Sequence, residues 1–323
     1  MVGITIGDAA GIGPEIVLKA LAKNKMNLPG RHVIIGDAAV LHRIARSFEL
    51  DISLCEFGDL SGAVEIFDLK NLSDSFQIGA DTATTGNASA ECIEAAVDLW
   101  RQGKIDAVCT APISKKAIAL AGYTFQGHTE FLASLTGTSD FAMSFFAEKL
   151  RVVLLSTHVS LTEAIKLIHR NSVLHLIQFA DREFSTLLGR KVSIAVAGLN
   201  PHASEGGMFG SEEAREIGPA VNEARSMGMD VSGPYSPDTV FLRGYKGDFD
   251  CVVALYHDQA TIAVKSLSFG SGVNVTLGLP MVRTSVDHGT AFDIAGKGIA
   301  DASSMVAAIK LAGELALSSR KPA

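Results

Sequence analysis

Residues 2–15 read Val-Gly-Ile-Thr-Ile-Gly-Asp-Ala-Ala-Gly-Ile-Gly-Pro-Glu, an apolar run followed by a glycine-rich turn and a proline. The run Val2–Ile6 has the length and the β-branched content of a buried strand. Pro14 is a preferred first residue of a helix, and apolar residues recur behind it at helical spacing. The stretch therefore predicts a strand, a tight turn and a helix, which together form the first unit of an α/β fold.

Short apolar runs continue to alternate with longer helical stretches, as expected for parallel strands joined by crossover helices. Further strands are predicted at His32–Ile35, Ile105–Cys109, Arg151–Leu155, Val192–Ala197 and Cys251–Leu255. Helices are expected from Pro14, from Ala88 to Arg101 behind Asn87 as N-cap, behind Ser160 with Glu163 at capping-box spacing, and over Ser211–Met227 and Ser303–Leu317. Residues 51–83 are polar and poorly periodic, and they predict an irregular excursion or a short hairpin.

The length of 323 residues corresponds to about two domains at roughly 150 residues each. No Pro/Gly/Ser-rich linker divides the chain, so the two domains are not expected to hang on a tether. We expect one α/β domain from residues 1–125 plus 285–323. A second, from residues 126–284, is expected to carry the metal and substrate residues and the dimer contacts.

Composition excludes several classes of protein. With 47% hydrophobic and 20% charged residues, the chain is neither disordered nor fibrous. Its net charge of −7, with no basic block longer than Lys115–Lys116, argues against nucleic-acid and anionic-membrane partners. The four cysteines have no C-x-x-C spacing, and neither a signal peptide nor an apolar stretch of about 20 residues is evident. We expect a cytoplasmic protein without a membrane span.

Three of the nine histidines follow predicted strands closely: His158, His202 and His257. Ligands of open α/β sheets bind outside the carboxyl ends of the strands, where these side chains would meet. Neutral imidazole suits Zn, Ni, Co and Fe, so the pattern predicts a divalent-metal site. A single histidine at such a place is more often a hydrogen-bonded structural residue or a substrate contact, and this alternative stays open on the residues alone.

Other polar residues suggest a small anionic substrate. The turn Gly7–Glu15 is neither G-x-G-x-x-G nor a Walker loop; it either presents backbone N–H groups to an anion or is only a tight turn. In Gly127–Glu130, His128 and Thr129 can donate to a phosphate, or Thr129 can cap a helix. Lys265, Asn274 and Arg283 follow in apolar surroundings, where Arg283 offers a fork for carboxylate or phosphate.

As a set, six segments resemble the 4-hydroxythreonine-4-phosphate dehydrogenase family of pyridoxal phosphate biosynthesis. They are Gly7–Glu15, Thr110–Ile113, Gly127–Glu130, Asn200–Gly210, Tyr256–Gln259 and Val286–Gly298. The first and last are also similar to segments of the isopropylmalate and isocitrate dehydrogenases. The resemblance implies that fold, with two α/β domains, largely parallel sheets and an active site in the interdomain cleft.

The resemblance also implies roles for individual residues. The metal, which is Zn, Mg, Co, Mn or Ni, would be held by His158, His202 and His257. The phosphorylated hydroxy-acid substrate would contact His128, Thr129, Lys265, Asn274 and Arg283. Lys265 is expected to transfer the proton, with Asp238 as the alternative. NAD would lie against a loop that contains His288, Asp293, Gly296 and Gly298.

The implied reaction is NAD-dependent oxidation of an alcohol β to a carboxylate, followed by decarboxylation. It would convert 4-phosphooxy-L-threonine to 3-amino-2-oxopropyl phosphate. Departures from the family pattern at Ala9, Ser114, Ser204 and Ala260–Val264 leave the substrate open. The alternative is a dehydrogenase of D-erythronate or D-threonate 4-phosphate in sugar-acid catabolism, and other members act on aromatic cis-diol carboxylates. A binding protein that has lost its chemistry, and a metal-dependent phosphatase or acyl-phosphate transferase, are competing classes.

Two further expectations concern the cofactor and the assembly. NAD is favoured over NADP because Asp293 and Asp301 flank the cofactor loop, although Lys297 also lies in it. A homodimer is expected, with the active site at or near the subunit interface. The alternative is a monomer whose interdomain cleft holds every ligand.

Overall fold

The computed structural model describes residues 1–24, 27–59, 61, 64–73, 76–125, 127–268 and 272–318. Contacts divide the chain into two compact units, one from Met1–Phe141 with Leu279–Leu317 and one built on Ala142–Gly278. These units divide at 141/142 and 278/279, whereas the domain boundaries expected from the sequence lie at 125/126 and 284/285. Within the described residues, no helix is both long and apolar enough to cross a bilayer.

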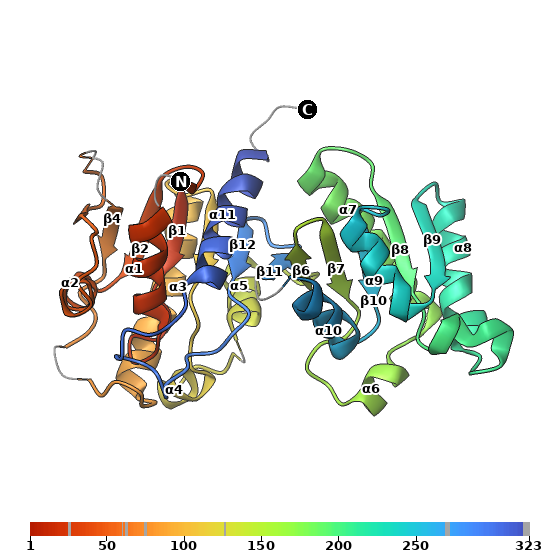
Figure 1. Cartoon of the computed structure of the whole chain (residues 1–323), viewed down its shortest axis with the longest axis horizontal. Helices are drawn as coiled ribbons and strands as arrows, with labels where there is room; N and C mark the ends of the chain where they lie inside the picture. The colour runs from red at the N-terminus through yellow and green to blue at the C-terminus, as the bar shows by residue number, and fades with distance from the viewer. Residues whose placement is uncertain are drawn as a thin grey trace. The chain divides into compact units, whose positions relative to one another are not determined.

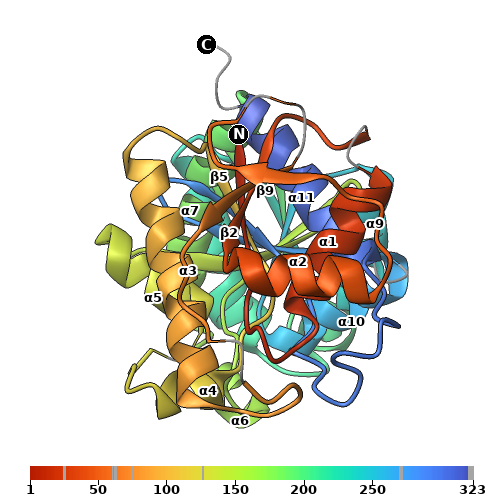
Figure 2. The same cartoon turned by 90° about the vertical axis from the view of Figure 1, so that its left-hand side faces the viewer.

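The first unit is a parallel sheet with helices on both faces. Its strands lie in the order β3-β4-β2-β1-β5-β12, and their printed pairings are all parallel. Figure 2 shows α3 on one side of this sheet and α1, α2 and α11 on the other. The elements are β1 (Val2–Thr5), α1 (Gly13–Asn24), β2 (His32–Gly36), α2 (Ala38–Ser47), β3 (Leu54–Glu56), β4 (Val64–Asp68), α3 (Ala83–Arg101), β5 (Ala107–Thr110), α4 (Lys115–Leu120), α5 (His128–Thr136), β12 (Val282–Ser285) and α11 (Ser303–Ser318).

The second unit is a mixed sheet in the order β11-β6-β7-β10-β8-β9, in which β6 runs antiparallel to both neighbours. Figure 1 labels the elements in this order of the chain. They are β6 (Ala142–Ala147), β7 (Leu150–Leu154), α6 (Leu161–Lys166), α7 (Arg170–Leu188), β8 (Ser193–Ala197), η2 (Pro201–Gly207), the π-helical turn η3 (Glu213–Ile217), α8 (Gly218–Ser226), β9 (Asp230–Tyr235), α9 (Pro237–Lys246), β10 (Cys251–Ala254), α10 (His257–Ser268) and β11 (Val273–Leu277).

Both faces of the central strands of this unit are covered. Val152 and Val153 are adjacent on β7, point to opposite faces, and are both fully buried. Val152 belongs to the hydrophobic cluster that includes Val240 of α9 and Val264 of α10. Burial on both faces explains why these strands have no alternation of apolar and polar residues in the sequence.

The α/β class and all six predicted strands are confirmed, but two local predictions are wrong. The helix expected from Ala88 begins at Ala83, because Thr82 accepts a hydrogen bond from the backbone N–H of Thr85 and caps it. Asn87 therefore lies inside the helix, where its side chain donates to Glu91. In the region 51–83, β3 and β4 pair in parallel, which a hairpin cannot do, although the stretch is otherwise irregular.

The quoted turn after β1 depends on two glycines. Gly7 has φ +68°, and a Cβ placed there would lie 2.3 Å from the carbonyl oxygen of Pro112. A Cβ on Gly13 would lie 2.2 Å from the carbonyl oxygen of Ile6. The turn is therefore packed against backbone on both sides, which explains its glycines without a ligand.

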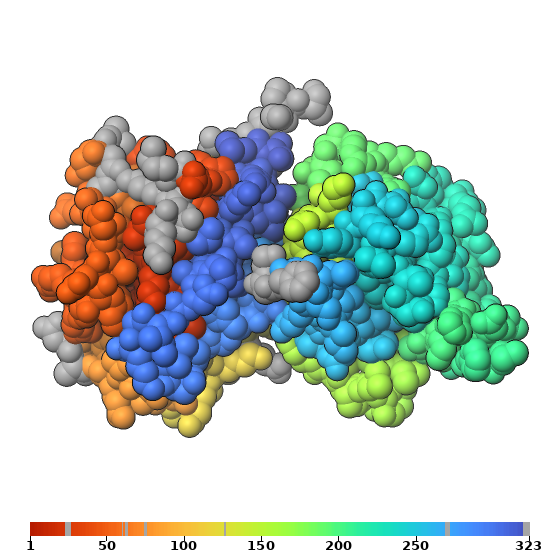
Figure 3. All heavy atoms as spheres, in the orientation of Figure 1, coloured from red at the N-terminus to blue at the C-terminus, as the bar shows by residue number. Residues whose placement is uncertain are grey.

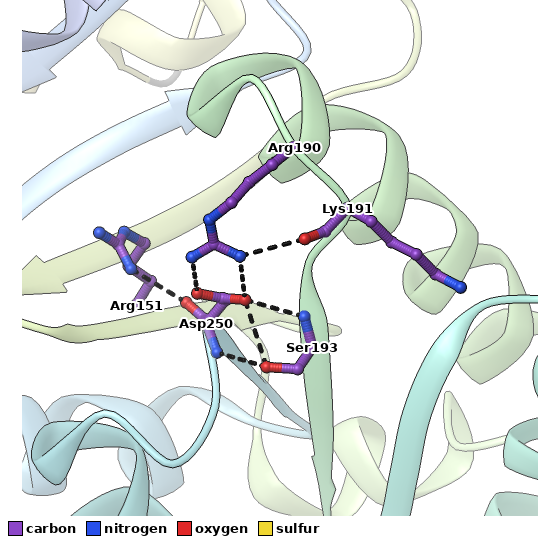
Figure 4. A network of polar contacts seen from close by, with 5 residues as sticks. All are labelled: Arg151, Arg190, Lys191, Ser193 and Asp250. Atoms are coloured by element: carbon purple, nitrogen blue, oxygen red, sulfur yellow. Dashed lines mark hydrogen bonds and ion pairs between the residues drawn. The ribbon is translucent and has the colours of Figure 1, made fainter.

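A polar network ties together the beginnings of three strands in the second unit (Figure 4). Asp250, just before β10, receives two hydrogen bonds from the Arg190 guanidinium and one from the backbone N–H of Ser193 on β8. Arg151 of β7 donates to the carbonyl oxygen of Asp250 at 3.3 Å. Because these strands are parallel, the network fixes their amino ends and leaves the carboxyl ends for the loops that carry the histidines.

Candidate active site

The carboxyl ends of β7 and β10 bring two of the three candidate ligands together. His158 lies in the loop after β7, and His257 is the first residue of α10, after β10. Their ring centroids are 5.7 Å apart, with an angle of 41° between the planes. Two imidazoles on one ion, with metal–nitrogen bonds of about 2.1 Å, have ring centroids roughly 5 to 6 Å apart. The pair therefore has a spacing that fits a shared divalent ion.

A carboxylate orients one of these rings. His257 Nδ1 lies 2.7 Å from Asp258 Oδ1, so Nδ1 carries the proton when the ring is neutral and Nε2 keeps a free lone pair. Histidine ligands of metals commonly donate their second N–H to a carboxylate in this way. The donor chemistry at His257 thus fits a metal ligand. Asp258 was missed by the sequence reading, although it directly follows the candidate histidine.

His202 lies elsewhere in the single chain. It is exposed on η2 after β8, and its ring centroid is 6.5 Å from that of Phe209. Within the described residues, no three histidine, cysteine or acidic side chains are placed to hold one ion. The expectation that the sheet alone gathers three imidazoles is therefore not met within one chain. The physical reason is that β8 continues into a left-handed turn, which carries His202 out on an exposed loop.

The other candidates of the second unit lie on α9, α10 and β11. Asp238 is exposed in the first turn of α9 and accepts a hydrogen bond from the Ser236 hydroxyl. Lys265 is exposed on α10, so the dry surroundings expected for a proton-transfer lysine are not present in the single chain. Asn274 on β11 has a buried Oδ1 atom without a hydrogen-bond partner among the described residues.

The first unit holds a separate cationic group. Arg283 on β12 is 3% exposed and donates to the hydroxyl of Thr110 at 2.9 Å. Burial lowers the pKa of its guanidinium to about 10, which leaves it charged at neutral pH. Burial and the charge of Arg283 also hold the pKa of His128, at the start of α5, well below its usual range. Thr129 is the next residue on that helix.

His128 is thus neutral at physiological pH, and it has unused hydrogen-bonding capacity. Its Nε2 atom is buried and has no hydrogen-bond partner among the described residues. A buried polar atom of this kind is normally paired, so the ring is poised for a ligand atom. Arg283 and His128 together can receive an anionic oxygen, one as a charged fork and the other as a neutral donor or acceptor.

The predicted cofactor loop packs on the turn after β1. Residues 286–302 form irregular backbone on the surface of the first unit, visible as blue spheres in Figure 3. The backbone N–H of Ile12 donates to the carbonyl of Thr290 at 3.0 Å. His288 and Asp293 are exposed, and Gly296 and Gly298 have φ values of +76° and +70°, which glycine adopts readily.

Two acidic residues of the Gly7–Glu15 turn were also missed by the sequence reading. Asp8 is fully buried, and its Oδ1 accepts the backbone N–H of Ala10 at 2.9 Å. Burial raises the pKa of its carboxyl. Glu15 is 2% exposed and accepts the backbone N–H of Ala300 at 2.9 Å. The spacing of the turn alone did not distinguish these buried carboxylates from surface charges.

Comparison with known proteins gives consistent results over almost the whole chain. The family profile described as "PdxA: Pyridoxal phosphate biosynthetic protein PdxA" matches residues 29–312. A D-threonate 4-phosphate dehydrogenase of Cupriavidus necator is 45% identical over 323 residues, covering 98% of this chain and 97% of the relative. A 4-hydroxythreonine-4-phosphate dehydrogenase of Desulforapulum autotrophicum is 44% identical over 320 residues, covering 97% and 94%.

A solved structure agrees with the fold. The crystal structure of 4-hydroxythreonine-4-phosphate dehydrogenase from Klebsiella pneumoniae is similar with a TM-score of 0.90 and 42% identity, and the match covers 98% of each chain. The likeness therefore includes both units and every element that carries a candidate residue.

Proposed function

Because this chain belongs to the PdxA family of dehydrogenases, which use NAD(P), we propose that it oxidises a four-carbon 3-hydroxy acid bearing a 4-phosphate and then releases its carboxylate as CO₂. Two substrates fit this class: 4-phosphooxy-L-threonine, with an amino group at C2, and D-threonate 4-phosphate, with a hydroxyl at C2. The second candidate is favoured by the relatives of that name, which reach 45% identity. D-erythronate 4-phosphate, an isomer of the threonate ester, belongs to the same class.

The observation that carries the proposal is the buried Arg283 beside His128. A buried guanidinium requires an anionic or strongly accepting partner, and a phosphate ester supplies both charge and several oxygens. Net charge cannot attract such a dianion to a protein of −7, so a local site must hold it. In this role Arg283 and His128, with Thr129, bind the phosphate, while Lys265 and Asn274 contact the remainder of the substrate.

A divalent metal at His158, His202 and His257 would supply Lewis-acid polarisation of the hydroxyl being oxidised and of a neighbouring oxygen. The chain itself orients the ligands, since Asp258 fixes the tautomer of His257. Lys265 takes the proton of the C3 hydroxyl, with Asp238 as the alternative base. The C3 hydride passes to the nicotinamide. The C1–C2 bond then breaks, and a proton returned to C2 completes the product.

The cofactor is proposed to be NAD, held by the loop with His288, Asp293, Gly296 and Gly298. Asp293 is exposed on this loop, and an acidic group near the ribose favours the unphosphorylated cofactor. Steady-state kinetics with both cofactors test this part of the proposal. A lower kcat/KM with NAD than with NADP would assign the dominant charge to Lys297.

The active form is proposed to be a homodimer in which His202 of one copy completes the pair His158–His257 of the other. Exposed apolar side chains lie beside both groups: Leu161 on α6 is 57% exposed, and Met208 at the end of η2 is 73% exposed. Exposed apolar groups of this size favour a protein interface. A second copy that covers them would also remove water from the exposed Lys265.

Coexpression of two inactive variants, H202A and H257A, with different tags tests the shared site. A heterodimer has one site with every histidine and one site that lacks two, so a random mixture should recover about a quarter of wild-type activity. The purified homodimers should be inactive. Heterodimers without activity, or an active species with the 33.9 kDa mass of one chain in light scattering, would contradict the proposal.

The substrate is tested by the appearance of NADH with 4-phosphooxy-L-threonine, D-threonate 4-phosphate and D-erythronate 4-phosphate side by side. The expected result is a kcat/KM at least about 100-fold above that of the matching unphosphorylated acid, because a lost charge-assisted phosphate site removes about 3 kcal/mol. Equal turnover of the phosphorylated and unphosphorylated acids would reject the phosphate site. Phosphate release or acyl transfer without NADH would reject oxidation.

A further inference from the structure

The segment that presents His202 has an unusual backbone. His202, Ala203, Ser204 and Glu205 have φ values of +52°, +52°, +67° and +46°, and Gly206 follows at +68°. Residues with a Cβ adopt this left-handed conformation singly and rarely, because Cβ then crowds the following carbonyl oxygen. A run of four such residues persists only where surrounding contacts fix it.

A buried carboxylate supplies those contacts at the beginning of the turn. Glu213 on η3 is 4% exposed. Its Oε1 accepts the backbone N–H of Leu199 at 2.8 Å and that of Asn200 at 2.7 Å, and its Oε2 accepts the side-chain amide of Asn200 at 2.8 Å. The carboxylate thus holds the two residues where the chain leaves β8 and enters the left-handed turn.

The end of the turn is held to the same asparagine. Glu212 Oε2 accepts the Asn200 amide at 2.8 Å and the backbone N–H of Ser211 at 3.0 Å. A Cβ on Gly210 would lie 2.6 Å from both the Asn200 amide nitrogen and Glu212 Oε2, so the closure is tight. The loop Asn200–Ser211 is therefore closed at its base, while His202 itself is exposed.

We propose that Glu213 is a positioning residue for His202, and that its carboxylate keeps the left-handed turn in the conformation that presents the imidazole to a divalent ion. This inference rests on the proposed metal role of His202. Glu213 does not touch the ion; it acts through the backbone of Leu199 and Asn200. Loss of its hydrogen bonds releases the strained turn, and His202 then samples positions from which it does not ligate.

Two variants separate positioning from general stability. E213A removes all three accepted hydrogen bonds. E213Q keeps an acceptor for the two backbone N–H groups and replaces Oε2 with an NH₂ group that faces the Asn200 amide, so a smaller effect is expected. E216Q is the matched control, because Glu216 lies on the same π-helical turn and also accepts a backbone N–H, that of Arg170 at 2.8 Å.

The readout is the Kd for Co²⁺ and Zn²⁺ of the whole protein in its native assembly, measured by competition with a chromophoric chelator and without substrate. E213A should weaken binding by about 10- to 100-fold, as losses of groups that orient metal ligands do. E213Q should weaken it less, and E216Q should stay within about twofold. H202A sets the value for complete loss of the ligand.

Hydrogen exchange of residues 199–207 provides a second readout. E213A and E213Q should speed exchange there, and E216Q should not. A lowered Tm for E213A with an unchanged metal Kd would overturn the inference and assign Glu213 to stability alone. If the wild-type protein binds no metal, or binds it as tightly as H202A does, the proposed metal role fails first and the inference falls with it.

Discussion

Lys19 Nζ lies 2.7 Å from Glu15 Oε1, one helical turn earlier on α1, and the same ammonium donates to the carbonyl oxygens of Gly298 at 2.8 Å and Ala300 at 2.9 Å. Glu15 Oε1 also accepts the backbone N–H of Ala300. The first helix therefore clamps the far end of the proposed cofactor loop with three lysine hydrogen bonds and one backbone N–H. All of these groups lie in the first unit.

Replacement of Lys19 with Met should raise the KM for NAD by about tenfold, because the loop is then ordered at the expense of cofactor binding. The kcat at saturating NAD and the KM for the acid should change less than about twofold. Steady-state kinetics with each substrate varied in turn check this split.

Lys310→Met is the control for the loss of a helical Lys–Glu pair. Lys310 and Glu314 form an exposed i,i+4 pair at 3.9 Å on α11, away from the loop. This variant should leave both KM values unchanged. Equal increases in the KM for NAD and the KM for the acid in K19M would show that the clamp has no specific effect on the cofactor loop.

Asp250→Asn should destabilise the protein at neutral pH and much less in acid. The hydrogen bond from Arg190 is the main cause that lowers the pKa of Asp250 to about 2, against 3.8 for the free side chain. A carboxyl with a depressed folded-state pKa stabilises the fold fully above its unfolded-state pKa, and this contribution is lost as pH falls through the folded-state pKa. The contribution is about 2 kcal/mol, so the difference from wild type should be present at pH 7 and should shrink between pH 4 and 2.

Urea unfolding across that pH range measures the difference. Asp248→Asn is the matched control, because the Arg243–Asp248 pair at 3.1 Å has exposed partners and should contribute less than about 1 kcal/mol. A constant difference between wild type and D250N from pH 7 to pH 2 would contradict the assignment of the network in Figure 4 to an ionised Asp250.

The sequence predicts the buried parallel strands well because each is a continuous apolar run. It misses β6, β9 and β11, whose sequences mix apolar with polar or glycine residues. Asn274 and Arg283 illustrate the reason: each lies in a short strand that packs through its neighbours, so the polar residue at a site interrupts the pattern that would reveal the strand. Element boundaries follow the same logic, since Thr82 caps α3 five residues before the predicted cap.

The site was predictable as far as residue types and chain order allow. His158 and His257 follow adjacent parallel strands, β7 and β10, and they meet as expected. His202 follows β8, which is also adjacent to β10, yet its position depends on a left-handed turn that no residue pattern announces. Only Gly206 in that run is a residue that favours positive φ.

Arg283→Lys should raise the KM for the phosphorylated substrate by about 10- to 100-fold, because a lysine ammonium cannot form the bidentate contact of a guanidinium. Thr110→Val is the control: it removes the hydroxyl that receives the Arg283 hydrogen bond and keeps the guanidinium, so its effect should be smaller. The KM for NAD should remain within about twofold in both variants. An R283K enzyme with a wild-type KM for the phosphate ester would exclude Arg283 from phosphate binding.

The low pKa of His128 adds a condition on this site. Burial and the charge of Arg283 keep the ring neutral, so His128 should not titrate between pH 6 and 8 in the free enzyme. Nuclear magnetic resonance of the histidine Cε1–H groups, with His128→Gln for assignment, follows the titration directly. A His128 signal that titrates near 6.5 would show that the ring is not held in the buried position described.

Glu205→Gly should stabilise the protein, although it shortens a side chain. Glu205 is exposed with φ +46°, a conformation that costs an L-residue about 1 to 2 kcal/mol and glycine almost nothing. Glycine loses about 0.5 to 1 kcal/mol more backbone entropy on folding, so the net gain should be about 0.5 to 1 kcal/mol. Arg215→Gly on the helical turn η3 is the opposite case, because glycine in a helix costs about 1 kcal/mol. Urea unfolding should therefore move the two variants in opposite directions, and a loss of stability in both would mean that Glu205 is not strained in solution.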